Sequence, residues 1–272
     1  MSATFRGHYL SDKLRYFTSV AKEVAREKGI IPVLRGGFKV GVDWLSDLIL
    51  CYYFKATRRH RIFAFQGADY RYLLHIYSDT WKNERTVEIP IIWDIVKKNC
   101  GKKILEVGNV LSHYFAVDHE VIDKYEKAIG VMNVDVVDFE PQNKYDLIVS
   151  ISTLEHVGAD EKPIYMPALA PGGRFGQDQP RNAMKIARAV ENLKRCLAPG
   201  GKIAVTLPIG QNPEMDRLLE EGVIAFSRLH FLRRISKDNL WVETNDNNIL
   251  WTKYNSPFPG ANAVTIGIYE RG

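Results

Sequence analysis

The chain has 272 residues, of which 46% are hydrophobic and 25% are charged, a composition typical of a globular protein with one large domain or one domain and an appendage. Its three cysteines are far apart and form no CxxC pair, so the sequence excludes a disulfide framework and a thiolate metal site and favours a cytoplasmic location. The net charge of +5 is unevenly distributed, because residues 1–100 carry +7, residues 101–160 carry −6 and residues 161–272 carry +4.

The N-terminal part predicts an extension that is helical and rich in aromatic residues. Amphipathic patterns predict helices over 14–28 and 42–61, and the second ends in a basic cluster that suits a helix C-terminus. Aromatic-rich runs at 61–65 and 70–77 are compatible with strand or helix. No apolar run follows the basic N-terminal residues and none reaches eighteen residues, so we expect neither a secretory signal nor a membrane span. The helix over 42–61 nevertheless permits peripheral contact with a membrane.

From residue 102 onward, short apolar runs alternate with helical or loop segments. The five runs that suit strands covered on both faces lie at 102–108, 120–123, 134–139, 145–152 and 202–209. A helical pattern at 182–197 ends at Pro and Gly, and two further runs at 240–244 and 263–269 predict a hairpin-like pair of edge strands. The sequence therefore predicts an α/β fold with a Rossmann-like, doubly wound, mostly parallel sheet of seven strands.

Polar residues stand where each of these runs ends. In an open parallel sheet, ligands bind beyond the carboxyl ends of the strands, at the point where the strand order reverses. The residues in these positions are Glu106 and Gly108, Asp123 and Glu126, Asp135 and Asp138, and Ser152 to His156. These residues lie in the acidic middle of the chain.

The same segments resemble the class I S-adenosylmethionine-dependent methyltransferases. The resemblance covers residues 102–210 and rests on five motifs: LEVG, the acid ending the second run, NVDVVDF, YDLIVSISTLEHVG and LAPGGKIAVTLP. It implies that S-adenosyl-L-methionine is the cofactor and that 101–272 form the methyltransferase domain, with 1–100 as a cap over the cofactor and acceptor or as a partner-binding part.

The resemblance also assigns cofactor contacts. Asp123, with Glu126 close behind, would accept hydrogen bonds from the ribose hydroxyls, since an acid about 20 residues beyond the first strand does so in dinucleotide sites. The remaining contacts would be Glu106 and Gly108 at the methionine end, Asp135 and Val136 at the adenine, and also Asn109 after the first run and Ser152 at the end of the fourth.

The loop after the first run departs from the glycine-rich pattern of a dinucleotide site. Val110 and Ser112 occupy positions where later glycines would let the backbone approach a pyrophosphate. S-adenosylmethionine has no phosphate, so this departure favours it over a dinucleotide. The spacing from Gly108 to the second run also predicts a short or absent first helix, which would bring Ser112, His113 and Tyr114 to the cofactor.

The acceptor side is predicted around the LEHV segment. Methyl transfer needs a positioned acceptor and, for a hydroxyl, a base; His156 suits that role with Glu155 beside it. Relatives that use this segment to hold a metal carry a further Glu where this chain has Ser152, so we expect no metal.

Two further stretches are expected to shape the acceptor pocket. Trp81, Arg85 and Glu88 precede the first strand, and the Pro- and Gly-rich segment 163–182 predicts a long loop or lid.

These features favour a methyltransferase acting on an oxygen of a small molecule, with a sugar or glycan-type hydroxyl as the acceptor class. Two alternatives remain at this point. The basic N-terminal part would serve an RNA methyltransferase, although no familiar RNA-binding module is present and nucleic acid is therefore the less favoured partner. The changes at Val110 and Ser112 are compatible with a non-catalytic binding protein of the same fold.

Overall fold

The computed structural model describes residues 18, 22, 25–26, 45–158, 183–246 and 248–272. The helix expected over 14–28 lies largely outside these ranges, and the loop expected over 163–182 lies wholly outside them.

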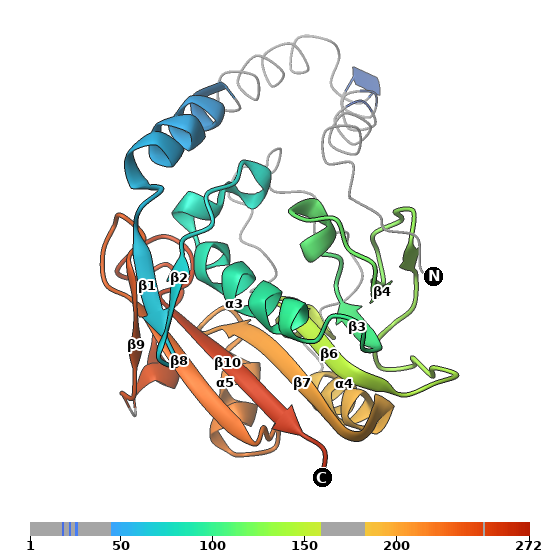
Figure 1. The fold of residues 1–272 in the computed structure, drawn as a ribbon. Coiled ribbons are helices and arrows are strands. Elements are labelled where there is room, and N and C mark those ends of the chain that lie inside the picture. The colour runs from blue at the N-terminus through green and yellow to red at the C-terminus, as the bar shows by residue number, and fades with distance from the viewer. Residues whose placement is uncertain (1–17, 19–21, 23–24, 27–44, 159–182, 247) are drawn as a thin grey trace.

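Within the described ranges, eight strands form one sheet in the order β5-β4-β3-β6-β7-β10-β8-β9 (Figure 1). Their bounds are β3 Ile104–Val107, β4 Glu120–Ile122, β5 Val131–Met132, β6 Tyr145–Ile151, β7 Leu197–Pro208, β8 Arg228–Arg234, β9 Trp241–Thr244 and β10 Ala263–Glu270. The five strands β5, β4, β3, β6 and β7, which are neighbours in the sheet, run parallel to one another, whereas β10 is antiparallel to both β7 and β8. The order reverses between β3 and β6, which makes the sheet doubly wound and confirms the Rossmann-like fold class. The described sheet has one strand more than the seven expected.

Helices cover both faces of the sheet (Figure 1). Their bounds are α3 Arg85–Lys98 on one face, and α4 Ala183–Cys196 and α5 Pro213–Glu220 on the other. Successive residues of β3 serve the two faces in turn: Ile104 packs in the core under α3, while Leu105 packs in the core under α4 and α5. Consecutive apolar positions are therefore all buried, as the sequence pattern predicts for an internal parallel strand.

The expected third strand was placed wrongly. The structure forms β5 earlier, and residues 134–139 form a turn instead of a strand. Val136 and Phe139 are apolar because their side chains pack in the core under α4. Their carbonyl oxygens accept hydrogen bonds from the side-chain amide of Asn192 on α4, at 2.9 Å each, in place of strand partners.

The C-terminal strands also differ from the expectation. β9 and β10 do not pair with each other, because β8 lies between them and pairs with both. The sequence of β8, RLHFLRR, is rich in arginine and did not suggest a strand. Its buried residues are Leu232 and Arg234, and the other side chains are partly or fully exposed.

The N-terminal part contributes a helix over residues 45–58 and a hairpin of β1 Ile62–Phe65 and β2 Ala68–Arg71. Gln66 and Gly67 both have positive φ, as a two-residue hairpin turn requires. Phe63 and Phe65 are buried against α3 and β10. The run at 61–65 is thus a strand, and the hairpin is joined to the sheet through the core. The domain boundary at residue 100 stays a prediction.

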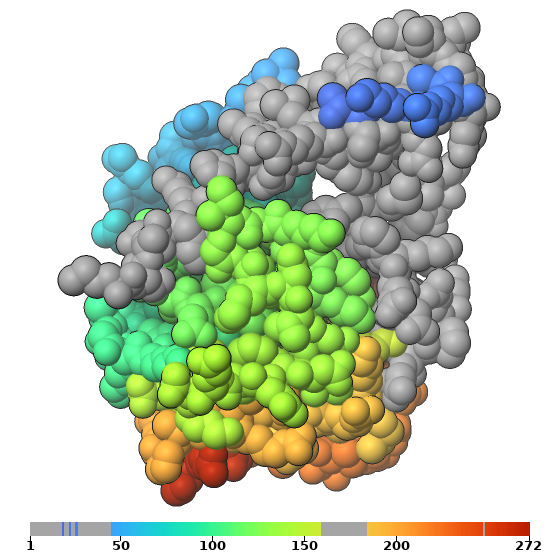
Figure 2. Space-filling model, turned by 90° about the vertical axis from the view of Figure 1, so that its right-hand side faces the viewer, coloured from blue at the N-terminus to red at the C-terminus, as the bar shows by residue number. Residues whose placement is uncertain are grey.

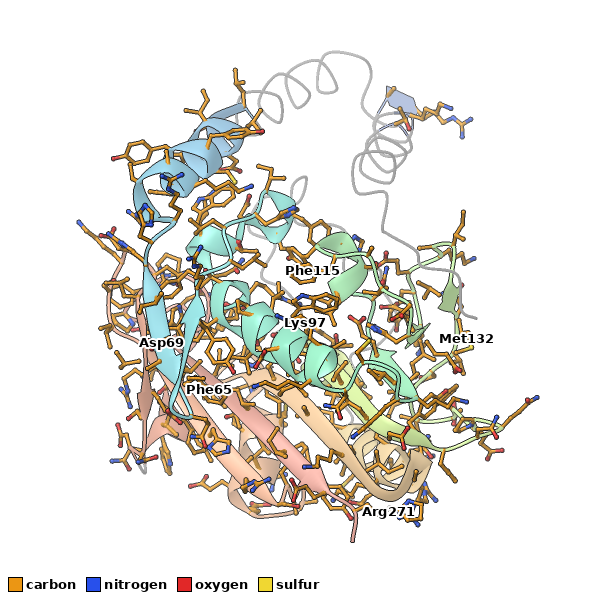
Figure 3. The ribbon with its side chains drawn as sticks, in the orientation of Figure 1. Phe65, Asp69, Lys97, Phe115, Met132 and Arg271 are labelled. Carbon is orange, nitrogen blue, oxygen red and sulfur yellow. The ribbon has the colours of Figure 1, made fainter. Side chains whose placement is uncertain are left out.

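In the described part of the chain, four short 3₁₀ segments connect the larger elements. They are η1 Tyr77–Lys82, η2 Leu111–His113, η3 Leu154–His156 and η4 Ile249–Trp251. The first helix after β3 is thereby reduced to η2, which confirms its expected shortness. Phe115, labelled in Figure 3, follows η2 and stacks on Trp93 of α3 with ring centroids 4.3 Å apart. Across the described ranges, no helix is long and apolar enough to cross a membrane.

Candidate cofactor and acceptor site

A cavity of about 280 Å³ lies beyond the carboxyl ends of β3, β4, β5 and β6, where the strand order reverses. Figure 2 shows the segment that carries β3 to β6, in green, in the middle of the visible face of the molecule. Eight of the ten residues to which the sequence assigns cofactor binding or catalysis line this cavity: Gly108, Asn109, Asp123, Glu126, Asp135, Val136, Ser152 and His156. Glu106 and Glu155 do not line it. The structure therefore brings most of the predicted set together, and the roles of its members stay predictions.

The turn after β3 is built around Gly108 and Glu106. Gly108 has φ +85°, and a Cβ on it would lie 2.2 Å from Oγ1 of Thr153, so no larger residue fits. Oε1 of the fully buried Glu106 accepts hydrogen bonds from the amides of Val110 and Leu111, at 2.9 and 2.7 Å. Its Oε2 lies 2.8 Å from Nε2 of His119. Glu106 thus binds the turn itself, which corrects the expectation that its side chain faces the ligand.

Two acids that follow β4, Asp123 and Glu126, are held in place with the help of this turn. The Oδ1 of Asp123 accepts hydrogen bonds from the amides of Tyr125 and Glu126, both at 2.8 Å, and its Oδ2 accepts one from the amide of Asn109 at 3.2 Å. Oε1 of Glu126 accepts from Nδ2 of Asn109 at 2.6 Å and lies 3.1 Å from Nε2 of His113. These contacts fix both carboxylates on the cavity wall.

The residues of η2 support the wall instead of forming it. Oγ of Ser112 donates to Oδ1 of Asn109 at 2.5 Å, and the ring of His113 stacks on Tyr77 with centroids 4.1 Å apart. Tyr77 lines the cavity, whereas Ser112, His113 and Tyr114 do not. The expectation of direct cofactor contact from these three residues was wrong, and sequence reasoning missed Tyr77, which is distant in sequence from every motif.

Asp135 follows β5 and forms ion pairs with two lysines. Its Oδ2 lies 3.1 Å from Nζ of Lys124 and 3.0 Å from Nζ of Lys185, and its Oδ1 accepts from the amide of Val137 at 3.1 Å. Burial opposes ionisation, but the Val137 amide and the two lysines outweigh it and lower the pKa of Asp135. Asp135 is therefore a carboxylate at neutral pH. The apolar residues Val107, Val110, Ile122, Val134 and Val136 line the cavity too.

The loop after β6 supplies the other wall. Ser152, Thr153, His156 and Val157 line the cavity. Nε2 of His156 lies 3.6 Å from Oε1 of Glu155 and 3.5 Å from Nε2 of Gln211. Glu155 is fully buried, and neither carboxyl oxygen has a hydrogen-bond partner in the part of the chain that the structure describes. Burial raises the pKa of Glu155 well above its ordinary value.

The three residues expected before the first strand divide between the cavity and the core. Arg85 lines the cavity, whereas Trp81 and Glu88 are buried outside it. In the described ranges, no three His, Cys, Asp or Glu side chains are arranged to hold a metal ion.

No protein-family model and no curated protein matches the chain. Among solved structures, it is similar to an S-adenosylmethionine-dependent methyltransferase from Archaeoglobus fulgidus (11% identity over 72% of this chain and 98% of that one, TM-score 0.41). It is also similar to the N-methyltransferase NodS from Bradyrhizobium japonicum WM9 in complex with S-adenosyl-L-homocysteine (14% identity, 66% and 84% covered, TM-score 0.38). A third is the sugar N-methyltransferase KedS8 from Streptoalloteichus (11% identity, 70% and 89% covered, TM-score 0.33). At these identities and scores, the likeness assigns no substrate. The strand order itself carries the conclusion that the chain has a Rossmann-like, doubly wound α/β fold.

Proposed function

We propose that the protein is an S-adenosylmethionine-dependent methyltransferase that transfers a methyl group to an oxygen of a small molecule, with a sugar or glycan-type hydroxyl as the acceptor class. The observation that carries the proposal is the use of the turn after β3. Its amides at Val110 and Leu111 bind Glu106 and are not presented to a ligand, while Asp123, Glu126 and Asp135 face the cavity. Such a site disfavours phosphate and favours a ligand with hydroxyl, amino and positively charged groups.

The chemistry of these residues fits S-adenosylmethionine. A carboxylate has about four acceptor positions, and described donors fill three on Asp123 and three on Asp135, which leaves each able to accept one more hydrogen bond. Asp123, with Glu126, would hold the ribose hydroxyls, and Asp135 with Val136 would hold the adenine. Gly108, Asn109 and Ser152 would face the methionine end.

When bound, the cofactor supplies an electrophilic methyl group on a sulfonium. The chain then has to exclude water, orient the acceptor and remove its proton. His156 lines the cavity with its side chain 26% exposed, so its imidazole can meet an acceptor hydroxyl and take up the proton. Glu155, buried behind it, would orient the ring. The N-terminal part supplies Tyr77 and Arg85 to the cavity wall, which supports its proposed role as a cap.

Calorimetric titration tests the cofactor. We expect S-adenosylmethionine and S-adenosylhomocysteine to bind with one site per chain and NAD⁺ to bind far more weakly. Absence of binding by a folded protein, or preference for NAD⁺, would overturn the proposal. Transfer of a labelled methyl group to a panel of sugars, amines and RNA then identifies the acceptor. Transfer of the label to RNA would instead favour an RNA methyltransferase. Cofactor binding without transfer to any acceptor would favour a non-catalytic binding protein.

A further inference from the structure

Ser152, the residue at which β6 ends, has a strained backbone. Its φ is +40°, a region that residues other than glycine rarely adopt, and its side chain is buried. Strained residues persist only where their surroundings over-determine them. The contacts that hold Ser152 therefore indicate which residues keep the following loop in position.

Those contacts come from β7 and from the first turn of α3. The amide of Ser152 donates to the carbonyl oxygen of Thr206 on β7 at 3.1 Å. Its hydroxyl donates to Oε1 of Glu88 at 2.6 Å. Its carbonyl oxygen accepts from Nη2 of Arg85 at 3.2 Å, and Nη1 of Arg85 donates to the preceding carbonyl, of Ile151, at 3.0 Å. Two residues three positions apart on α3 thus bind the side chain and the carbonyl of Ser152.

Arg85 and Glu88 also stabilise each other. Nε of Arg85 lies 3.8 Å from Oε2 of Glu88, whose side chain is fully buried. That oxygen has no hydrogen-bond partner among the described residues. Burial raises the pKa of Glu88, and the positive charge of Arg85 acts in the opposite direction. Removing the guanidinium would leave a buried carboxyl group facing Ser152 without compensation.

The position of Ser152 sets the geometry of both cavity walls. Thr153 comes next in the chain and occupies the space that a side chain on residue 108 would need. η3 follows at once and carries His156. A shift of Ser152 would therefore move His156 on one wall and release the turn at Gly108 on the other.

We propose that Arg85 and Glu88 are positioning residues of the site, which hold Ser152 in its left-handed conformation and through it place Thr153 and His156 on the cavity wall. The significance of this placement for methyl transfer rests on the function proposed above. The placement itself exists without any ligand and can be tested in the protein alone.

Hydrogen exchange of the amides at 152–156 provides that test. We expect Arg85→Met to increase their exchange about tenfold or more, because the loss of two donors frees the turn. The matched control, Arg71→Met on the exposed side of β2, should leave these amides unchanged. Glu88→Gln keeps an oxygen for the Ser152 hydroxyl and should exchange like the wild type, whereas Glu88→Ala should exchange faster. Unchanged exchange in a folded Arg85→Met protein would overturn the proposal.

A double-mutant cycle separates positioning from direct ligand contact, since Arg85 itself lines the cavity. Ser152→Gly removes the backbone strain, because glycine adopts positive φ readily. Arg85→Met should weaken binding of S-adenosylhomocysteine by about 10- to 100-fold in the natural background and by less than about threefold in the Ser152→Gly background. Equal losses in both backgrounds would show that Arg85 contacts the ligand and would overturn the positioning role. Absence of binding by the wild type would count against the proposed function alone, since the exchange measurement needs no ligand.

Discussion

The two halves of the cavity use carboxyl groups in opposite ways. At the ends of β4 and β5, Asp123 and Asp135 each receive several hydrogen bonds, and the pKa of Asp135 is lowered. Behind the β6 end, Glu88 and Glu155 are fully buried, each has an oxygen without a hydrogen-bond partner in the described chain, and the pKa of each is raised. In the first half, Asp135 therefore keeps its negative charge at neutral pH. In the second half, burial favours the protonated forms of Glu88 and Glu155, and Glu88 accepts a hydrogen bond from Ser152, which precedes the loop that carries His156.

The largest effect is expected from His156→Ala, which removes the proposed base from the β6 half. Methyl transfer to a hydroxyl acceptor should fall by about 10²- to 10⁴-fold in kcat, with the dissociation constant of S-adenosylhomocysteine largely unchanged. Steady-state kinetics with labelled cofactor measure both quantities, and His60→Ala, at an exposed position, is the control. A variant as active as the wild type would show that the acceptor needs no base from this half, as an amine acceptor would not.

Asp123→Asn tests the β4 half. The change keeps an oxygen for the amides of Tyr125 and Glu126 but removes an acceptor on the cavity side, so we expect the dissociation constant for S-adenosylhomocysteine to rise by about 10- to 100-fold. Calorimetry measures the change, and Asp118→Asn, on an exposed side chain, is the matched control. If both variants bind equally well, the carboxylates of this half do not hold the ribose.

The pH dependence of the free energy of unfolding should reflect the buried carboxyl group of Glu88 in the β6 half. Burial raises the pKa of Glu88 from 4.5 to about 7, even though Arg85 opposes the shift. The folded state therefore binds more protons than the unfolded state between pH 4.5 and 7, and the free energy of unfolding contributed by Glu88 falls as pH rises through this window.

Glu88→Gln cannot titrate, so its free energy of unfolding should lose about 1–3 kcal/mol less than that of the wild type between pH 5 and pH 7.5. Urea unfolding followed by circular dichroism measures the difference, with the exposed Glu140→Gln as control. Parallel pH dependence in wild type and variant would contradict the contrast between the two halves.

The smallest effect is expected outside the cavity, on the helix of residues 45–58. Ile49 and Tyr52 are 61% and 65% exposed there, and Lys55 and Arg59 lie beyond them. If this helix touches membranes as its pattern allows, Ile49→Glu should reduce flotation with anionic vesicles a few-fold. Ile129→Glu, at an apolar side chain that is 83% exposed, is the control. Equal flotation of both variants, or none by the wild type, would exclude the contact.

The sequence predicted the elements whose burial follows from local pattern. β3, β6 and the second half of β7 are rich in consecutive apolar residues because helices cover both faces of the sheet, and α4 has clear helical spacing. The turn at 134–139 has the same apolar composition but receives its hydrogen bonds from Asn192, a contact between distant residues that no local pattern encodes. The sequence did not predict β8 for the opposite reason. Its arginine-rich composition is not typical of a buried strand, and its place in the sheet comes from pairing with β10.

The candidate site was predictable to a similar degree. Acids at strand ends could be placed on the cavity because parallel strands end at one edge of the sheet. The direction in which each side chain points could not be predicted, since it depends on hydrogen-bond partners in other parts of the chain. Glu106 turns to the amides of its own loop, and Arg85 reaches the end of β6 from α3. Tyr77, which lines the cavity, is held there by stacking on the ring of His113.

The carboxylate of Glu106 fills the inside of the turn after β3, where it accepts from two backbone amides. Its two hydrogen bonds use backbone amides that a turn of this kind would otherwise present to an anionic ligand. ATP and NAD⁺ share adenine and ribose with S-adenosylmethionine, so the base and sugar contacts alone would not distinguish them. Because Glu106 already accepts from the amides of Val110 and Leu111, those amides are not free to bind a phosphate, and on the proposed function this turn would favour a phosphate-free ligand over ATP or NAD⁺.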